Sequence, residues 1–249
     1  MVSTPVVIDA AGLHYSELNQ SLREAVLGGQ RHIDVRNVYG QRYIGTNLAA
    51  PVHLEVFGTP GNDLGAFMDG PTIVVHGNAQ DGCGNTMNEG QIVVHGRAGD
   101  ITGLSARGGR IFIRDGVGYR VGIHMKEYES KRPCLVVGGT AQDFLGEYMA
   151  GGVLVVLGLE LREGEPHRAR FIGTGMHGGV IYLRGQVEQQ QLGREVGVAE
   201  LDDDDRATLE GLVREFCRHF GHHERDILDA EFVKLFPLYL RPYGRLYAY

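Results

Sequence analysis

The sequence has no tryptophan, only three cysteines, and no apolar run of 18 residues in a length of 249. We therefore expect no transmembrane helix, and the first residues lack the basic start and apolar core of a signal peptide. Cys83, Cys134 and Cys217 are widely spaced and form no CxxC pair. This spacing predicts reduced thiols and a cytoplasmic protein.

Basic residues are also scarce. The chain has 24 lysines and arginines against 31 aspartates and glutamates, which gives a net charge of −7. No sustained basic patch interrupts this balance. We therefore expect neither a nucleic-acid partner nor a membrane partner, because binding to phosphate backbones requires clustered positive charge.

Glycine is abundant, with 38 residues, and it marks a repeat of about 19 residues between Gly58 and Gly185. Each copy has glycine at both ends, alanine or proline at the third position, and aspartate or asparagine at the fifth. The copies are Gly58–Gly65, Gly77–Gly84, Gly96–Gly103 and Gly139–Gly146. A fixed period of this size indicates a stack of similar structural units.

A unit of this length predicts a particular fold. It is too short for a strand, a crossover helix and a loop, which need more than about 30 residues. It suffices for short strands joined by tight turns, and glycines at a fixed phase supply the positive φ that such corners require. We therefore predict a single-stranded parallel β-helix. An antiparallel β-sandwich is the alternative, but its turns would not repeat the same chemistry in phase.

The β-rich run that ends each unit predicts the core. Alternate positions should stack inside the coil as aliphatic ladders: Ile73/Val75, Ile92/Val94, Ile111/Ile113, Leu135/Val137 and Leu154/Val156. The positions between them are apolar as well: Val74, Val93, Phe112, Val136 and Val155. Strands that are apolar on two faces are covered on two faces. We expect the outer face to pack against the terminal helices or against another subunit.

Three regions follow from these patterns. Residues 1–30 form an N-terminal helical segment, with a helix over 16–27 that Ser16 caps and Gly28 and Gly29 end. Residues 31–186 form the β-helix, which begins with strands at 32–35 and 52–56 and has longer loops at 116–135 and 158–171.

Residues 187–249 form a C-terminal helical tail. Asp202–Asp205 favour a helix N-terminus, and Gly221 ends that helix. A second helix is predicted over 224–235, before Pro237. Aromatic residues then follow in the tail: Tyr239, Tyr243, Tyr247 and Tyr249.

Several motifs resemble functional sites. Gly173–Gly178 matches GxGxxG, but a dinucleotide site needs a helix after it, whereas a strand, Val180–Leu183, follows here. His76 and His95 share one repeat phase with Phe57 and Arg114. They could form a metal pair, but no carboxylate shares their phase, so we favour a side-chain ladder.

Three further groups have a structural interpretation beside a functional one. Asp81, Asp100 and Asp143, with Asn62, recur at one phase, which is compatible with calcium-binding turns or with Asx turns. We favour Asx turns, because calcium-binding turns use a nine-residue repeat. His222–His223–Glu224 is interpreted as a solvated turn. No cysteine is placed for nucleophilic catalysis, so we assign no catalytic, cofactor-binding or metal-binding residue to this chain.

The repeats also resemble a known family. Gly61–Gly70, Gly84–Gly90, Gly146–Gly158 and Gly173–Leu183 are similar to the GXGXG repeats in the C-terminal domain of glutamate synthase large subunits. The segment Leu209–Leu228 and the closing Lys234–Gly244 resemble the tail of that domain. The resemblance covers nearly the whole chain. It implies a right-handed β-helix without catalytic residues, which braces glutaminase and FMN-binding synthase domains.

The departures from that family imply a separate subunit. The glutaminase needs a cysteine at its mature N-terminus, where this chain has Val2, and the flavin barrel and iron–sulfur cysteines are missing. The resemblance implies a scaffold subunit of a split glutamate synthase, or of a relative such as an N-methylglutamate synthase. Its partners would be a glutaminase chain and a synthase chain, and the latter would carry FMN and an iron–sulfur cluster.

Other functions remain open. The same repeat domain occurs in one subunit of formylmethanofuran dehydrogenase, a molybdenum or tungsten enzyme. A free-standing β-helix enzyme, such as a carbohydrate lyase, is a third possibility. That class usually lines a groove with several charged residues at matched phase, and we find no such set in this sequence. A homo-oligomer is also compatible with the sequence.

Overall fold

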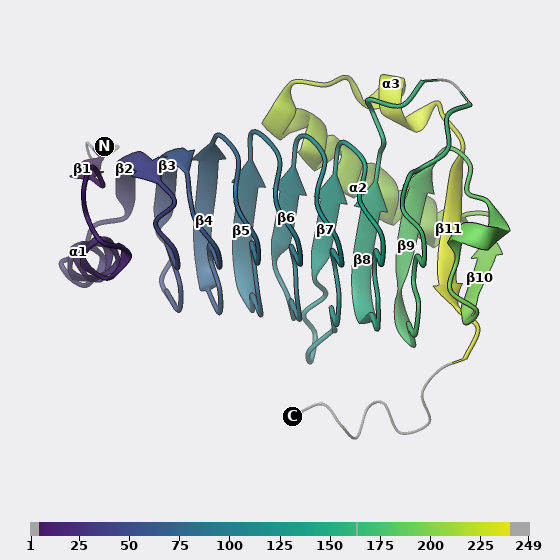
Figure 1. Cartoon of the computed structure of the whole chain (residues 1–249), viewed down its shortest axis with the longest axis horizontal. Helices are drawn as coiled ribbons and strands as arrows, with labels where there is room; N and C mark the ends of the chain where they lie inside the picture. The colour runs from purple at the N-terminus through teal and green to yellow at the C-terminus, as the bar shows by residue number, and fades with distance from the viewer. Residues whose placement is uncertain (1–4, 163, 240–249) are drawn as a thin grey trace.

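A computed structural model describes residues 5–162 and 164–239 as an elongated coil of strands, with one helix at its N-terminal end and further helices alongside its later strands (Figure 1). Within that range one 11-stranded sheet has the order β1 to β9, followed by β11 and β10. The first nine strands are β1 Val6–Asp9, β2 His32–Tyr39, β3 His53–Thr59, β4 Asp69–His76, β5 Glu89–Val94, β6 Arg110–Ile113, β7 Cys134–Val137, β8 Ala150–Val156 and β9 Gly178–Arg184.

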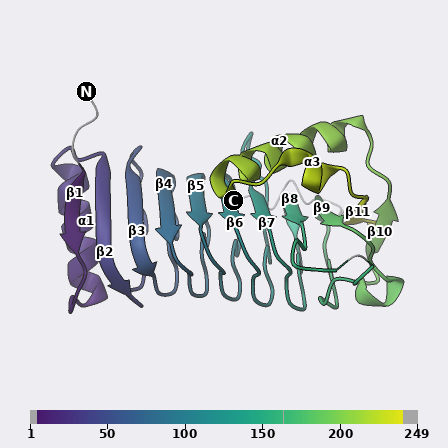
Figure 2. The same ribbon diagram turned by 90° about the horizontal axis from the view of Figure 1, so that it is seen from above.

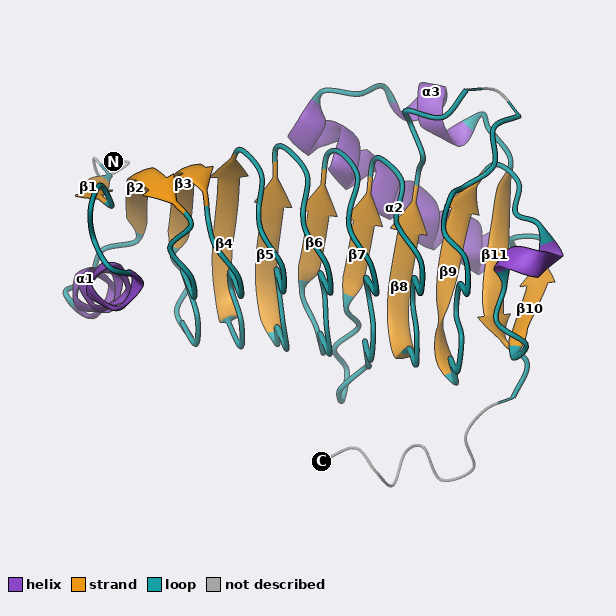
Figure 3. Ribbon diagram, viewed as in Figure 1, coloured by secondary structure: helices purple, strands orange, loops and turns teal. Residues whose placement is uncertain are grey.

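The nine strands pair in parallel, each with the next strand along the chain. The chain therefore advances by one strand per turn of the coil, with loops and corners on its other sides (Figure 3). This confirms the parallel β-helix predicted from the repeat. β1 was not predicted, because it lies outside the glycine repeat.

The interior of the coil is filled by the predicted ladders. Ile73 lies opposite Ile92, which lies opposite Ile111, and the same register continues through Leu135 and Leu154. These side chains are at most 2% exposed. Identical register in each turn stacks like side chains at the strand spacing of about 4.8 Å, which is why the repeat keeps the same apolar type at this position.

Each turn contains a corner in which three alternate residues have left-handed backbone. In the corner before β4 these are Asp63, Gly65 and Phe67, with φ of 62°, 65° and 58°. The middle residue is glycine in each corner of this kind: Gly45, Gly65, Gly84, Gly103, Gly122, Gly146 and Gly173. This alternation is the structural form of the repeated glycine motif.

Two features of the structure favour glycine at the middle position of each corner. Its φ is positive, and a Cβ at Gly84 would lie 2.4 Å from Cδ1 of Ile111 in the inner ladder. The backbone N–H of Gly84 donates to the Leu64 carbonyl one turn before, while the N–H of Thr86 donates to the Leu104 carbonyl one turn later. Alternating left-handed residues therefore direct the corner amides to the two neighbouring turns in alternation.

The N-terminal end of the coil is closed by α1, Tyr15–Leu27. Leu18 and Leu22 of this helix are buried in the core cluster of the coil. The prediction that Ser16 caps the helix is wrong. The N-cap is His14, whose backbone N–H donates to the Glu17 side chain, and the Ser16 hydroxyl lies 2.7 Å from Nδ1 of His14.

The long helix α2, Asp203–Phe220, lies along the outer face of the coil over the later strands (Figure 2). It begins at the N-cap Asp202 and ends at Gly221, which has φ 74°, as predicted. Phe216 is fully buried. It joins one apolar cluster with the outer side chains Val93, Phe112, Val136, Val155 and Tyr182. The expected cover of the outer face by a terminal helix is confirmed for β5 to β9.

The region after α2 differs from its prediction. The second helix, α3 Glu224–Leu228, stops well before residue 235. The strand β11, Phe232–Pro237, follows and pairs antiparallel with β9 and with β10, Val196–Ala199. The last parallel strand needs a partner for its open edge, and this tertiary requirement overrides the helical pattern. A short 3-10 helix, Gln189–Gln191, precedes β10.

The remaining predictions concern loops and chain ends. Residues 126–133, 159–162 and 164–171 leave the regular coil in the predicted loops, and the first of these segments projects at its lower edge before β7 (Figure 1). Val2 and three tail tyrosines, Tyr243, Tyr247 and Tyr249, lie outside the described residues.

Two buried carboxylates attach α2 to the coil. Glu215 accepts a hydrogen bond of 2.6 Å from Nε2 of Gln91 and forms an ion pair with Arg110. Asp205 accepts a hydrogen bond of 2.6 Å from the Tyr182 hydroxyl and lies 2.5 Å from Nζ of Lys234. Burial alone would raise the pKa of Asp205, but hydrogen bonds from Lys234 and Tyr182 outweigh it and lower that pKa below the usual 3.8.

We expect Asp205 to make the fold sensitive to acid. A carboxyl with a lowered pKa in the folded state stabilises that state above its unfolded pKa and loses this contribution as pH falls below about 3.8. Asp205→Asn should therefore reduce stability at pH 7 by about 1–3 kcal/mol and flatten the loss below pH 4. Urea unfolding at several pH values measures both effects. The exposed Asp203→Asn is the control, and identical pH profiles for Asp205→Asn and wild type would refute this assignment.

Candidate functional site

The glycine motif at 173–178 is one corner of the coil. Gly173 and Gly175 have φ of 68° and 71°, and Met176 is buried in the core. β9 begins at Gly178, so no helix follows the motif. A dinucleotide site needs a helix N-terminus at this point to bind the pyrophosphate. The geometry therefore does not fit a dinucleotide.

The histidines predicted to form a ladder do so. The rings of His76 and His95 stack at 5.5 Å with an interplanar angle of 14°, and Phe57 stacks on His76 at 4.6 Å. His95 also meets Phe220 of α2 edge-on at 5.1 Å. Burial, together with the neighbouring charges of His76 and Arg114, lowers the pKa of His95. The ladder thus lies where the C-terminal end of α2 meets the coil.

Glu55 does not share the repeat phase of this ladder, because it pairs with Val74 in the register of β3 and β4, but its carboxylate contacts a ladder histidine. Glu55 lies 2.6 Å from Nε2 of His76 through one oxygen and 2.6 Å from Nε2 of His53 through the other. Glu55 lies two residues before Phe57 on β3, so the alternation of side chains along a strand predicts that it faces outward, but not that it contacts His76. Across the described residues, no group of three or more His, Cys, Asp or Glu side chains has an arrangement that could hold a metal ion.

The recurring aspartates bond in a way that the sequence did not predict. Oδ1 of Asp81 accepts the backbone N–H of Asp100, and Oδ1 of Asp100 accepts that of Tyr119, each at 2.9 Å. Asp143 does the same with Arg170 at 2.9 Å. The Asx-turn interpretation, with a bond to a nearby amide, is therefore wrong for these three residues. Each carboxylate instead ties its turn of the coil to the next.

The other candidate residues have structural surroundings. Cys83 is fully buried in a corner, and burial raises the pKa of its thiol to about 12, which suppresses the nucleophilic thiolate. His222 and His223 are exposed, as expected for a solvated turn, and Glu224 pairs with Arg214 at 3.3 Å. In the described part of the chain, no helix has the length and hydropathy needed to cross a membrane.

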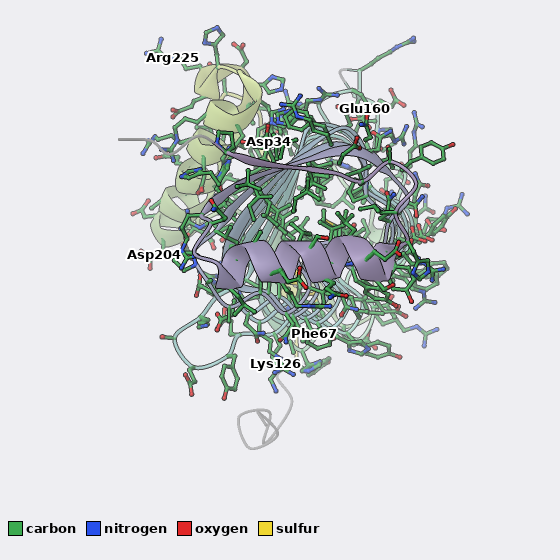
Figure 4. All side chains as sticks on the ribbon, turned by 90° about the vertical axis from the view of Figure 1, so that its left-hand side faces the viewer. Asp34, Phe67, Lys126, Glu160, Asp204 and Arg225 are labelled. Carbon is green, nitrogen blue, oxygen red and sulfur yellow. The ribbon has the colours of Figure 1, made fainter. Side chains whose placement is uncertain are left out.

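The corner side chains form an exposed surface that the sequence did not reveal. Large side chains two positions before or after the middle glycine point outward, and Phe67, Tyr148 and Phe171 are 50%, 46% and 50% exposed. Figure 4, a view along the coil, places Phe67 at its lower side and Asp204 of α2 at another side. The sequence contained evidence of this surface, because large residues occupy variable positions of the glycine motif. Only the structure shows that these positions are outside the coil.

Comparisons with known proteins agree with this architecture. The GXGXG motif family model matches residues 32–239. A protein of Methanocaldococcus jannaschii named "Uncharacterized protein MJ1350" is 49% identical over 250 residues, covering 97% of this chain and 96% of that protein. The formyltransferase/hydrolase complex FhcABCD of Methylorubrum extorquens, solved with methylofuran, contains a chain with a TM-score of 0.59 and 20% identity. That match covers 91% of this chain and 88% of the other, and at this identity it supports the fold alone.

The family match begins at β2 and extends to the end of β11 and the two residues after it. It thus includes the coil with its left-handed corners, α2 on its outer face, and the antiparallel strands that close its last turn. The chain belongs to the GXGXG motif family.

Proposed function

We propose that this chain is the non-catalytic scaffold subunit of a glutamate synthase-like complex in the cytoplasm. Its partners are a glutaminase chain and a synthase chain, and ammonia passes between them. The observation that carries the proposal is the GXGXG family match over residues 32–239, because this domain occurs in glutamate synthase large subunits. FMN and an iron–sulfur cluster belong to the synthase partner in this proposal, and this chain binds neither.

The architecture supports a bracing role. The long coil has one face covered by α2 from β5 to β9, whereas the outer side chains of β3 and β4, such as Glu55 and His76, remain partly exposed. The backbone of each corner bonds to both neighbouring turns. Such a coil is rigid along its length and offers separate surfaces to two partners.

A second candidate is a component like the GXGXG-containing subunit of a formylmethanofuran dehydrogenase-type molybdenum or tungsten enzyme. One observation favours it: the chain similar in structure belongs to the FhcABCD formyltransferase/hydrolase complex. The fold is compatible with both complexes, so the subunits and cofactors of the purified complex must distinguish the two candidates.

Co-purification from the native organism tests the proposal. The tagged chain should retain a glutaminase and a flavoprotein, identified by mass spectrometry, and the complex should contain FMN and iron with labile sulfide. Molybdenum or tungsten with a formyl-transferring partner would favour the second candidate. A chain that retains neither set of partners would contradict both.

A further inference from the structure

The last turn of α2 packs against the coil through aromatic rings and two histidines (Figure 2). His219 of the helix lies 5.0 Å from the ring of Phe112 on β6, and the next helix residue, Phe220, meets His95 of β5 edge-on at 5.1 Å. Both histidines are partly buried. One imidazole from each element therefore lies in the same contact, which we call the latch: His95, Phe112, His219 and Phe220.

The His219 ring is poorly placed to hold a second proton. Its Nε2 atom is enclosed and has no hydrogen-bond partner among residues 5–162 and 164–239. A protonated imidazole carries an N–H on both nitrogens, so protonation would leave a charged donor enclosed without an acceptor. Burial lowers the pKa of His219 below the usual 6.5, and the nearby charges of Arg218 and His95 lower it further. Glu215 acts in the opposite direction, but it is already ion-paired with Arg110.

The surroundings of His95 also disfavour its protonated form. Burial lowers the pKa of His95, and the charges of His76 on β4 and Arg114 after β6 lower it further. Asp115 lies beside them, but its two oxygens accept hydrogen bonds of 2.9 Å from the Arg114 guanidinium. Glu55 acts in the opposite direction, but one of its oxygens already lies 2.6 Å from Nε2 of His76.

Proton uptake therefore favours an open form of the latch. A histidine whose pKa is lowered in the closed form regains its ordinary pKa when the contact opens, so the open form binds more protons. The closed form is fully favoured above the ordinary 6.5 and loses this preference as pH falls below it. The helix dipole favours a cation in the last turn of α2, but the exposed Arg218 already supplies one there.

We infer that the latch is a proton-sensitive switch, which holds the last turn of α2 on the coil when His95 and His219 are neutral and releases it when they take up protons. This inference goes beyond the proposed function and does not depend on it. Release is limited to the last turn, because Glu215 and the buried Phe216 attach the preceding turn to the coil. It uncovers one side of the Phe112 ring, so mild acid gives the coil a new apolar surface.

Hydrogen exchange in the full chain tests the switch. Opening at the amides of residues 218–221, corrected for the intrinsic exchange rate, should increase at least tenfold from about pH 7.5 to about pH 5.5. The reason is that each pKa lowered by one unit raises the opening equilibrium by up to about tenfold. The amides of β8 are the internal reference and should not change. Equal opening of residues 218–221 at the two pH values would overturn the inference.

Paired variants assign the effect to the two histidines. His95→Phe combined with His219→Phe keeps a ring at each position and removes both protonation sites, so the opening should no longer depend on pH. His223→Phe is the matched control, because His223 is an exposed histidine just beyond α2, and it should keep the wild-type increase. An undiminished increase in the double variant, or its loss in His223→Phe, would contradict the switch.

An NMR titration of the wild-type chain gives a result that does not depend on whether the variants fold. The imidazole protons of His95 and His219 should titrate with midpoints below the ordinary 6.5. A midpoint at or above that value for either histidine would remove the thermodynamic basis of the latch, and the inference would then be wrong.

Discussion

The Gly84→Ala chain is expected to be less stable than wild type by about 2–5 kcal/mol. Left-handed backbone costs a residue with a Cβ about 1–2 kcal/mol, and forcing an extra methyl into a packed core costs about 1–3 kcal/mol. Both apply here, because Gly84 has φ 72° and its Cβ would lie 2.4 Å from Cδ1 of Ile111. Guanidinium unfolding followed by circular dichroism measures the difference.

The control for this prediction uses the next corner of the coil, where Ser105 lies two residues after the middle glycine Gly103. Ser105 has φ 53° and its backbone N–H donates to the Ile123 carbonyl, so Ser105→Gly keeps that bond and relieves the strain. We expect Ser105→Gly to be at least as stable as wild type. A Gly84→Ala chain of wild-type stability would show that the middle glycine is dispensable, and the physical explanation of the corners would then be wrong.

The Phe216→Ala chain is expected to lose about 3–5 kcal/mol, the usual cost of removing a buried phenylalanine ring. Phe216 is fully buried between α2 and the coil, and its ring lies so near Gly138 that a Cβ there would be 2.6 Å from Cζ. The loss should be local to α2, because the inner ladders of the coil form a separate cluster without Phe216.

Hydrogen exchange shows whether the loss is local. The amides of α2 should exchange faster in Phe216→Ala, whereas those of β4 and β5 should keep their protection. Phe67→Ala, which truncates an exposed ring, is the control and should change neither region. Equal loss of protection in α2 and in β4 would mean that the helix and the coil unfold as one unit, contrary to this prediction.

The sequence predicted the parts of the fold that depend on a local repeat. Each turn places an aliphatic residue such as Ile92 at the same phase, and in-register stacking follows because the turns have equal length. The outer positions, such as Val93 and Phe112, are also apolar in successive turns, which predicted that another element covers the outer face of the coil. Helix α2 was visible through its acidic start at Asp202 and its apolar face.

The sequence could not predict contacts that depend on the assembled coil. Phe232–Pro237 becomes a strand because β9 presents an open edge, a condition that no local pattern carries. Glu55 meets His76 only when β3 and β4 lie side by side. The left-handed φ of Arg120 and Phe171 contradicts their residue preferences, so the conformation of these corner residues was not apparent either.

In its proposed role, this chain holds a glutaminase and a synthase together without catalysing either reaction. The most direct test measures glutamine-dependent and ammonia-dependent glutamate formation by the two partner chains, with and without this chain. We predict that ammonia-dependent synthesis persists without it, that glutamine-dependent synthesis falls at least tenfold, and that adding the chain restores it. Glutamine-dependent synthesis at full rate in its absence would contradict the claim.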